Sequence, residues 1–456
     1  MAVAPRAGRE ANERLRAVME EAGCSNTGLA RRVNTCGAEH GLDLRYDKTS
    51  VARWLRGQQP RGRAPAIIAE ALERKLGRTV TVDDIGMSTG PGLAPSVGLR
   101  FEPTVAGALQ QACALWRSDT KYSGPVTRER LGTSVLVQAS RDWLIAEPDP
   151  SVAVSGVPAV GLADIEVVRA TTAALTDLDH SFGSGHIRPV AVRYLDSVVS
   201  GLLAGPYRES TGRLLLGAVA RLTELTAYMT VDTGQLGLAQ RYYIQALRLA
   251  QAADDRVFGG YVLASGMGHV ALLLDNPGET VQLAKVAREG TQRRITPTAR
   301  AVFYAAEARG HALLGDAGAC EKAVDQVLEV LNGDGPDAHE RQEGIPHVDR
   351  AYLAQELAHC YQDLGRPEAA VRWAQEALRE GAPNARRRAL RLLLLASVEL
   401  QLGEVERSYG SAAQGVEVLG GVRSVQCARG LEAFRGRLEA LGRHEEAHRL
   451  HPAEEH

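Results

Sequence analysis

The sequence predicts an all-α protein in which a small N-terminal domain of short helices precedes an α-solenoid of stacked helical hairpins. Three observations support this fold class. Apolar residues recur at the spacing of amphipathic helices along most of the 456-residue chain. In the second half, a turn signal returns about every 39 residues. Aromatic residues make up only 5% of the chain, whereas the small residues that let helices pack closely are abundant.

Residues 1–88 are predicted to form the N-terminal domain. Four stretches in it place apolar residues on one face of a helix. These stretches contain Leu15, Val18, Met19 and Ala22; Leu29, Ala30 and Val33; Val51, Trp54 and Leu55; and Ile67, Ile68, Ala71 and Leu72. Four short amphipathic helices of this kind predict a small helix-turn-helix domain. Residues 89–99 are predicted to be a linker, because Gly90-Pro91-Gly92 and Pro95 break any helix.

The third of these helices carries the strongest functional signal. Asp47 is placed to cap its first turn, and Gly57 is placed to end it in a left-handed conformation. Its apolar residues share the inward face. The residues predicted to lie on the opposite face or its flank are Thr49, Ser50, Arg53 and Arg56. A helix that buries one edge and presents hydroxyl and guanidinium groups on the other is typical of a reader of the DNA major groove.

A series of short motifs runs through this region. They are Leu29-Ala30-Arg31-Arg32-Val33, Thr49-Ser50-Val51, Trp54-Leu55, Gly57 and Pro60. Together they resemble the lambda-repressor-like (XRE or Cro/CI) helix-turn-helix family. The chain departs from that family between Leu29 and Val51, where Gly37 to Tyr46 form an insertion. The alternative is a small helical bundle that is used only for protein contacts.

The side chains around this helix divide into two predicted groups of DNA contacts. Thr49, Ser50 and Arg53 are expected to reach base edges, and Arg53 can bind a guanine through two hydrogen bonds. The residues that bracket the helix and are expected to contact phosphates are Arg45, Lys48, Arg61 and Arg63. Residues 1–90 hold 15 Lys and Arg against 11 Asp and Glu, whereas the whole chain holds 53 against 55. A basic head on an acidic body is expected when only the head touches DNA.

Residues 100–209 show helical patterns without a clear repeat. Two helical stretches are predicted around residues 104–116 and 127–144, followed by a loop from Glu147 to Gly161 that contains three prolines. Further helical stretches follow at residues 162–178 and 189–203. The region is expected to be a helical connector or a set of irregular first hairpins.

Residues 210–450 are predicted to form the repeat array. Its turn signals are Leu236-Gly237, Asp275-Asn276, Leu314-Gly315, Leu364-Gly365, Leu402-Gly403 and Leu441-Gly442. One step, from 315 to 365, is longer, and it contains a loop between Asn332 and Pro346. A period of this size indicates stacked helical hairpins. The alternative is a plain helical bundle in which the turns recur by chance.

The best single repeat unit lies in the second half of the array. It contains Ala358, Tyr361, Ala370, Ala374 and Ala377. The pattern resembles tetratricopeptide repeats, although Ala374 stands where that family expects a bulky residue. Polar residues on the first helix of each hairpin normally line the groove of such an array. Arg309 and Gln355 are the candidates here, and either is equally compatible with a solvated surface position.

A common catalytic motif, the phosphate-binding G-x-x-x-x-G-K-[ST] loop, is missing from the sequence. We therefore expect no enzyme activity, no cofactor and no metal site. The six cysteines are scattered singly and are expected to be reduced. No apolar run of 18 residues and no secretory signal are present, so we expect a cytoplasmic, nucleoid-associated protein without a membrane span.

The segment from Tyr46 to Gly57, together with the repeat array, resembles actinomycete regulators that carry tetratricopeptide repeats and control development and secondary metabolism. The resemblance implies a transcriptional regulator that binds an operator in double-stranded DNA. Its repeats would mediate homodimerisation, bind a peptide or protein ligand, or do both. The alternative hypothesis is a protein-interaction scaffold whose N-terminal domain docks a protein partner instead of DNA.

Overall fold

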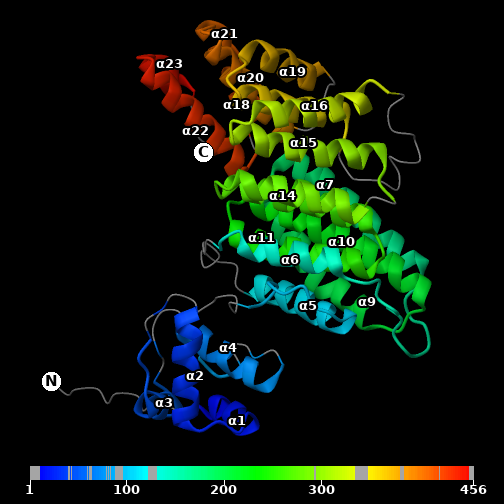
Figure 1. The fold of residues 1–456 in the computed structure, drawn as a ribbon, viewed down its shortest axis with the longest axis vertical. Coiled ribbons are helices and arrows are strands. Elements are labelled where there is room, and N and C mark those ends of the chain that lie inside the picture. The colour runs from blue at the N-terminus through cyan, green and yellow to red at the C-terminus, as the bar shows by residue number, and fades with distance from the viewer. Residues whose placement is uncertain are drawn as a thin grey trace, which may run out of the picture. The chain divides into compact units, whose positions relative to one another are not determined.

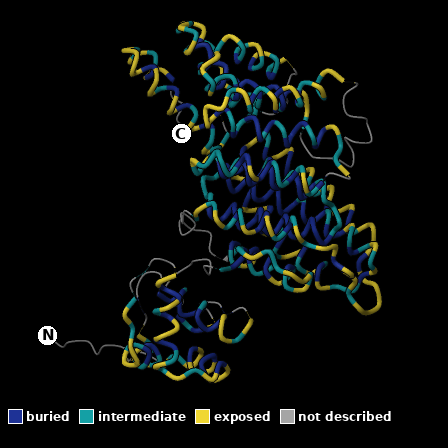
Figure 2. Tube along the Cα trace, in the orientation of Figure 1, coloured by how far each residue is buried: buried dark blue, intermediate teal, exposed yellow. Residues whose placement is uncertain are grey.

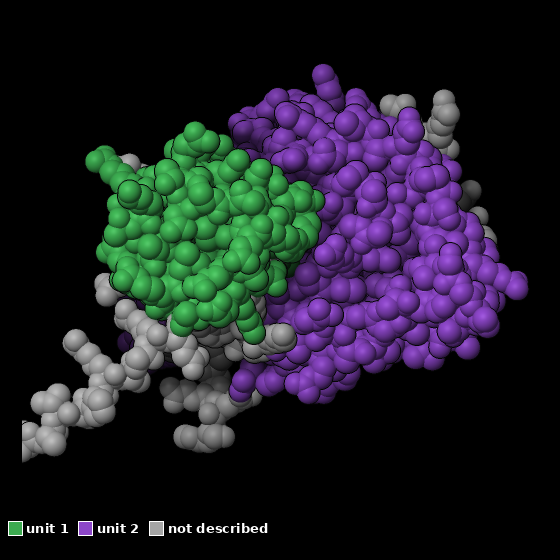
Figure 3. Space-filling view, turned by 90° about the horizontal axis from the view of Figure 1, so that it is seen from below, with its two compact units in different colours: residues 1–97, 121–126 green, residues 98–120, 127–456 purple. Residues whose placement is uncertain are grey.

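The structure is a computed structural model that describes most of the chain. The described residues are 11–39, 42, 44–58, 60, 64–78, 80, 82, 84–87, 96–121, 131–291, 294–333, 348–379, 385–420 and 422–450. Within these ranges the protein is all-α and has no strand, apart from an isolated bridge between Val154 and Tyr207. It combines a small helical N-terminal unit with a helical solenoid, which confirms the predicted fold class. The first unit comprises residues 1–97 and 121–126, and the second comprises the remaining residues (Figure 3).

The N-terminal unit contains four helices that coincide with the four predicted apolar stretches. These helices are α1 (Glu13–Glu21), α2 (Asn26–Glu39), α3 (Lys48–Leu55) and α4 (Ala64–Leu76). Their inward residues form one hydrophobic core, in which Leu15, Leu29, Val51, Ile68 and Leu72 are completely buried. All four helices therefore depend on the same small core, and none of them packs independently of the others.

The insertion between α2 and α3 is held against α2 by specific contacts. Its first residues extend α2 to Glu39. The Asn34 side chain then donates a hydrogen bond of 2.9 Å to the Tyr46 carbonyl and accepts one of 2.9 Å from the Tyr46 amide. Gly37 leaves room for Leu44, because a Cβ atom at Gly37 would lie 2.5 Å from Leu44 Cδ1. The insertion is thus anchored at both ends, and it delivers the chain to α3 in a defined position.

The second unit begins with helices that precede the repeat array. They are α5 (Val105–Lys121), α6 (Ser134–Ile145), α7 (Leu162–Phe182), α8 (Ser184–Tyr194), the π-helical segment η2 (Leu195–Val199) and α9 (Ser200–Ala204). α7 and α8 form a hairpin that packs against α10 (Glu209–Asp232), whereas α6 packs against α11 (Leu236–Ala252) and α14 (Pro277–Thr291) (Figure 1). Within residues 100–209, α7 and α8 therefore form a hairpin ahead of the array.

Six helical hairpins follow in sequence. The first pairs α10 with α11. The second pairs a long helix, made of α12 (Arg256–Tyr261), the π-helical segment η3 (Val262–Met267) and α13 (Gly268–Leu273), with α14. The other four pair α15 (Pro297–Leu313) with α16 (Ala317–Leu331), α18 (Arg350–Asp363) with α19 (Pro367–Arg379), α20 (Ala385–Gln401) with α21 (Val405–Val418), and α22 (Val425–Ala440) with α23 (His444–Arg449).

The hairpin turns correct one of the predicted turn positions. In the last four hairpins the predicted glycine adopts a positive φ, with values of 74° to 78° at Gly315, Gly403 and Gly442 and 68° at Gly365. The first turn, however, is made by Gly234, with φ at 78°, and Gly237 lies buried inside α11. In the second turn, Asp275 of the predicted pair Asp275-Asn276 is the left-handed residue, with φ at 59°. The longer loop before Gly365 falls largely at residues 334–347, outside the described residues.

The centre of the second unit is formed by α10 and α11. Every residue of α11 from Gly237 to Ala252 is buried, including its polar ones, and Figure 2 shows burial concentrated in this region. Arg248 forms a two-pronged ion pair with Asp149, with both N–O distances 2.9 Å. The Gln245 amide donates to the carbonyls of Gly98 and Arg100. α11 thereby binds the chain that enters the unit and the loop that follows α6.

α10 is the one helix in the described part of the chain whose length and composition would suit a membrane span. Of its most apolar window, 78% is buried inside the protein. Such burial is typical of the core helix of a globular fold.

Candidate functional site

Helix α3 is fixed by a reciprocal cap and two buried side chains. The Asp47 carboxylate accepts a hydrogen bond of 2.8 Å from the Ser50 amide and another of 2.8 Å from the Ser50 hydroxyl. These bonds lower the pKa of Asp47 below its ordinary value. Val51 and Trp54 anchor the opposite edge in the core, and the Trp54 ring meets Tyr46 edge-on at 4.9 Å. Gly57 ends the helix with φ at 82°.

The structure places most of the predicted DNA-contacting residues on the surface around α3. Arg45, Lys48, Thr49, Arg53 and Arg56 are exposed. Ser50 is half-buried, and its hydroxyl already donates a hydrogen bond to Asp47. The other two predicted phosphate contacts, Arg61 and Arg63, lie outside the described residues.

The cations on α3 differ from others of the same unit in their pairing. Among the described residues, no carboxylate forms an ion pair with Lys48, Arg53 or Arg56; the two arginines instead donate weakly to backbone carbonyls one turn back, at 3.4 and 3.2 Å. In contrast, Arg74 pairs with Glu39 and Glu70, and Arg78 pairs with Glu21. Arg74 and Arg78 thus link separate parts of the unit, whereas Arg53 and Arg56 face solvent without a described carboxylate partner.

Two further exposed arginines were not assigned a role from the sequence. Arg31 and Arg32 of α2 are exposed, and no ion pair joins either of them to a described residue. The sequence contained a signal for them, because both belong to the Leu29–Val33 motif. They extend the set of unpaired cations in the first unit beyond α3.

The second unit contains a pocket that is lined mainly by the first helices of successive hairpins. Its volume is about 150 Å³. Both groove candidates, Arg309 of α15 and Gln355 of α18, are among its lining residues. The structure therefore brings these two residues to one site, although they are far apart in the sequence.

Both groove candidates are tied to neighbouring helices. Arg309 forms ion pairs with Asp363 and, at 3.6 Å, with Glu356. Burial favours the neutral form of Arg309, but the two carboxylates raise its pKa above the ordinary value. The Gln355 carbonyl accepts a hydrogen bond of 3.2 Å from Arg391 Nε. Both candidates thus line the pocket. Arg309 also joins α15 to α18, and Gln355 joins α18 to α20.

Several lining residues could not be assigned to a site from the sequence. They include Glu224 and Tyr228 of α10, Tyr243 of α11, Tyr261 of α12 and Tyr352 of α18. The tyrosines look like ordinary core aromatics in a helical pattern. Glu224 offered a clearer signal, because it is a single carboxyl group in the middle of the long apolar helix α10.

A local irregularity of the backbone shapes one wall of this pocket. The π-helical segment η3 contributes Ala264, Ser265 and Gly266 to the lining. A Cβ atom at Gly266 would lie 2.4 Å from Tyr243 Cε1, so only glycine admits the Tyr243 ring there. Single π-turns within α-helices are frequent at functional sites.

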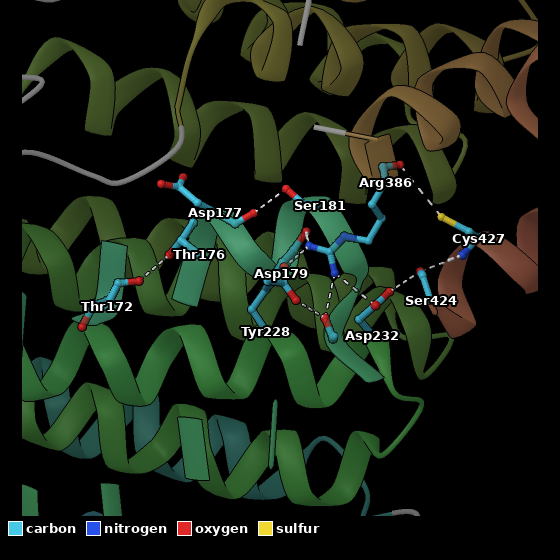
Figure 4. Close-up of polar contacts among 11 residues, drawn as sticks. Thr172, Thr176, Asp177, Asp179, Ser181, Tyr228, Asp232, Arg386, Ser424 and Cys427 are labelled. Carbon is cyan, nitrogen blue, oxygen red and sulfur yellow. Dashed lines mark hydrogen bonds and ion pairs between the residues drawn. The ribbon is translucent and has the colours of Figure 1, made fainter. Parts of the chain in front are cut away.

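A network of buried charges lies beside the pocket (Figure 4). Arg386 of α20 is fully buried and forms ion pairs with Asp179 of α7 at 2.6 Å and with Asp232 of α10 at 3.0 Å. It also donates to the Tyr228 hydroxyl at 2.9 Å. Burial raises the pKa of Asp179 above its ordinary value, although the charge of Arg386 opposes this shift. Tyr228 belongs to both the network and the pocket lining.

Comparison with known families gives a match for the N-terminal unit only. Residues 15–88 match the family model described as the SP15 N-terminal domain. The match covers α1 to α4 and does not reach the solenoid. No curated protein matches the chain. The first unit is therefore similar to SP15 N-terminal domains, and the helical solenoid defines the class of the remainder.

Proposed function

We propose that the protein is a sequence-specific DNA-binding transcriptional regulator of the lambda-repressor-like type, with tetratricopeptide-like repeats that receive a ligand and join two copies. The observation that carries the proposal is the surface of α3. That surface gathers exposed hydroxyl and guanidinium groups whose charges are not paired with any described carboxylate. Such a surface suits a polyanion, and a short helix with a rigid cap suits a groove.

The contacts around α3 support a defined orientation of this helix. Asn34 fixes the backbone of Tyr46, and Tyr46 packs on Trp54. The helix therefore cannot slide along the core without breaking these contacts. Base readout requires side chains held in register with the groove, and a rigid entry to the helix supplies this condition.

One such unit makes few phosphate contacts, so strong binding requires two half-sites and a homodimer. The solenoid is the part of the chain that would provide the dimer contact. Its groove would receive the ligand that regulates binding. The protein would act on chromosomal DNA in the cytoplasm.

The test begins with genome-wide immunoprecipitation to find the operator, followed by fluorescence anisotropy on that duplex. Arg53→Ala should weaken operator binding by about 1–3 kcal/mol and relax the preference at one base pair. Lys75→Ala is the matched control, because it removes an exposed cation of the same unit from α4. Wild-type affinity should fall steeply as salt rises.

Two results would overturn the proposal. The first is an empty immunoprecipitation profile with partner proteins still recovered, which would favour the scaffold that docks a protein. The second is equal operator binding by the wild type and Arg53→Ala, which would remove α3 from the reading surface.

A further inference from the structure

The pocket of the second unit contains one buried carboxyl group that the protein itself does not satisfy. Glu224 is 7% exposed and lines the pocket. No described residue forms a hydrogen bond or an ion pair with its carboxyl group. The cation that most affects it, Arg221, is itself paired with Asp255 at 2.9 Å. Buried carboxyl groups normally have hydrogen-bond partners, so this one points to a group from outside the chain.

The other charged residues that line the pocket differ from Glu224, because each is paired within the protein or neutral. Arg309, Arg387 and Arg391 all have partners within the protein. Glu356 pairs with Arg309. His269 is buried near Arg309, and these two influences lower its pKa to about 4, so that it is neutral at physiological pH. Glu224 is therefore the unsatisfied group, and its ionised form lacks a hydrogen-bond donor that carries positive charge.

Aromatic rings surround this carboxyl group. Tyr243 and Tyr261 are close enough to Glu224 for its charge to raise their pKa further, beyond the larger effect of burial. Tyr228 and Tyr352 line the same pocket. A carboxylate among aromatic rings is the arrangement that recognises organic ammonium ions, because the faces of the rings attract cations.

We propose that this pocket binds the ammonium group of a small organic amine or of a peptide N-terminus, with Glu224 as its counter-ion and the surrounding tyrosines as its walls. The proposal deepens the ligand-binding role of the solenoid and rests on that part of the proposed function. The volume of about 150 Å³ is enough for a group about the size of benzene. The bound group is therefore small, or it is the end of a longer molecule.

The ionisation of Glu224 gives binding a distinctive dependence on pH. Burial raises the pKa of Glu224 to about 8, so the carboxyl group of the free protein is protonated at neutral pH. Arg221 on α10 acts on its charge, and the tyrosines that line the same pocket are Tyr228 on α10, Tyr243 on α11, Tyr261 on α12 and Tyr352 on α18. Burial raises the pKa of Tyr243, Tyr261 and Tyr352, so these three phenols are neutral at neutral pH. An ammonium ligand then displaces the proton of Glu224, and its affinity rises with pH up to about 8.

The test is calorimetric titration of the full chain with benzylamine, with benzyl alcohol and benzoate as probes of the same shape and different charge. We expect benzylamine alone to bind, and to bind roughly tenfold more tightly for each pH unit between 6 and 8. Glu224→Gln should weaken its binding by at least about tenfold. This variant should fold, because Gln matches the protonated carboxyl group in shape. The matched control is Glu432→Gln, the same change at an exposed position of α22.

A second variant tests the pocket by its shape. Gly266→Ala should block benzylamine binding, because the added methyl group forces the Tyr243 ring to move. Short peptides with free or acetylated N-termini then separate the two sources of the ammonium group. Binding of the free form identifies a peptide end, and binding of benzylamine without either peptide identifies a small amine.

The proposal is overturned if benzyl alcohol or benzoate binds with the same affinity as benzylamine. It is also overturned if Glu224→Gln binds benzylamine like the wild type, or if no probe binds. None of these measurements involves DNA. If benzylamine does not bind but the wild type still binds its operator, only the ammonium site is refuted. If Arg53→Ala binds the operator as the wild type does, the role of α3 is refuted and the ammonium site is not affected.

Discussion

The two units of the protein handle charge in opposite ways. On α3 the cations face solvent and have no described carboxylate partner, whereas in the second unit Arg248 and Arg386 are buried and matched by aspartates. A solvated charge costs little and remains available to an external polyanion. A buried charge must be satisfied within the fold. The comparison shows that pairing and burial together indicate whether an arginine joins helices or is available for binding.

Glu224 departs from the pattern of the second unit. It is buried like Asp149 and Asp179, but no described residue pairs with it. Glu224 therefore differs from the two aspartates in having no described ion-pair partner, and not in how far it is buried. A buried carboxylate with a partner stabilises the fold, whereas one without a partner is available to bind a ligand.

The largest expected effect comes from removing the central arginine of the buried network. Arg386→Leu would leave Asp179 and Asp232 buried without their cation, and should lower the free energy of unfolding by about 3–5 kcal/mol. Arg379→Leu makes the same change at the exposed end of α19, where the side chain is 78% exposed, and should have little effect. Urea denaturation of both variants measures the difference. Equal stability of the two would show that burial of Arg386 contributes nothing to the fold.

The next effect concerns Glu224 and depends on pH. The folded pKa of about 8 lies above the ordinary carboxyl value, so the unfolded chain loses this proton first. Glu224 therefore destabilises the fold increasingly as pH rises from about 5 to 8, and fully above 8. Glu224→Gln should match the wild type near pH 5 and exceed its stability by a few kcal/mol, on the order of 3, at pH 8.5. Urea denaturation at the two pH values measures this change, and a gap that does not vary with pH would mean that Glu224 has an internal partner.

The smallest effect concerns the entry to α3. Asn34→Ala removes both hydrogen bonds to the Tyr46 backbone, and should cost about 1–2 kcal/mol of stability in the first unit. Thr35→Ala is a neighbouring control, because its hydroxyl bonds only to the Arg31 carbonyl at an exposed position. Hydrogen exchange of the α3 amides measures the change. Unchanged protection in Asn34→Ala would show that the insertion does not position α3.

Local patterns made the first unit and most hairpin turns predictable. The cap at Asp47, the inward edge with Val51 and Trp54, and the glycine turns from Gly315 onwards depend on neighbours in the sequence. The first turn was placed wrongly because Leu236-Gly237 mimics the turn dipeptide. The left-handed residue is Gly234, and Gly237 starts the helix after it.

The pocket and the buried network could not be predicted, because their members meet only through the tertiary fold. Tyr228 and Arg386 are 158 residues apart, and Asp179 and Arg386 are 207 apart. A single sequence does not show that residues so far apart are in contact. Glu224 was visible as a carboxyl group in the apolar middle of α10, but its lack of a partner depends on the surrounding helices.

The link between Arg386 and Asp179 has a consequence for how the second unit unfolds. An array of hairpins that contact only their neighbours can fray from either end, one repeat at a time. Here α20 also packs on α7, and Arg386 bridges α7 and α10. If the later hairpins detached, Asp179 and Asp232 would lose the ion pairs that they form with Arg386. The unit should therefore melt in one cooperative step, and a chain shortened before α20 should lose the stability of helices that lie two hundred residues upstream.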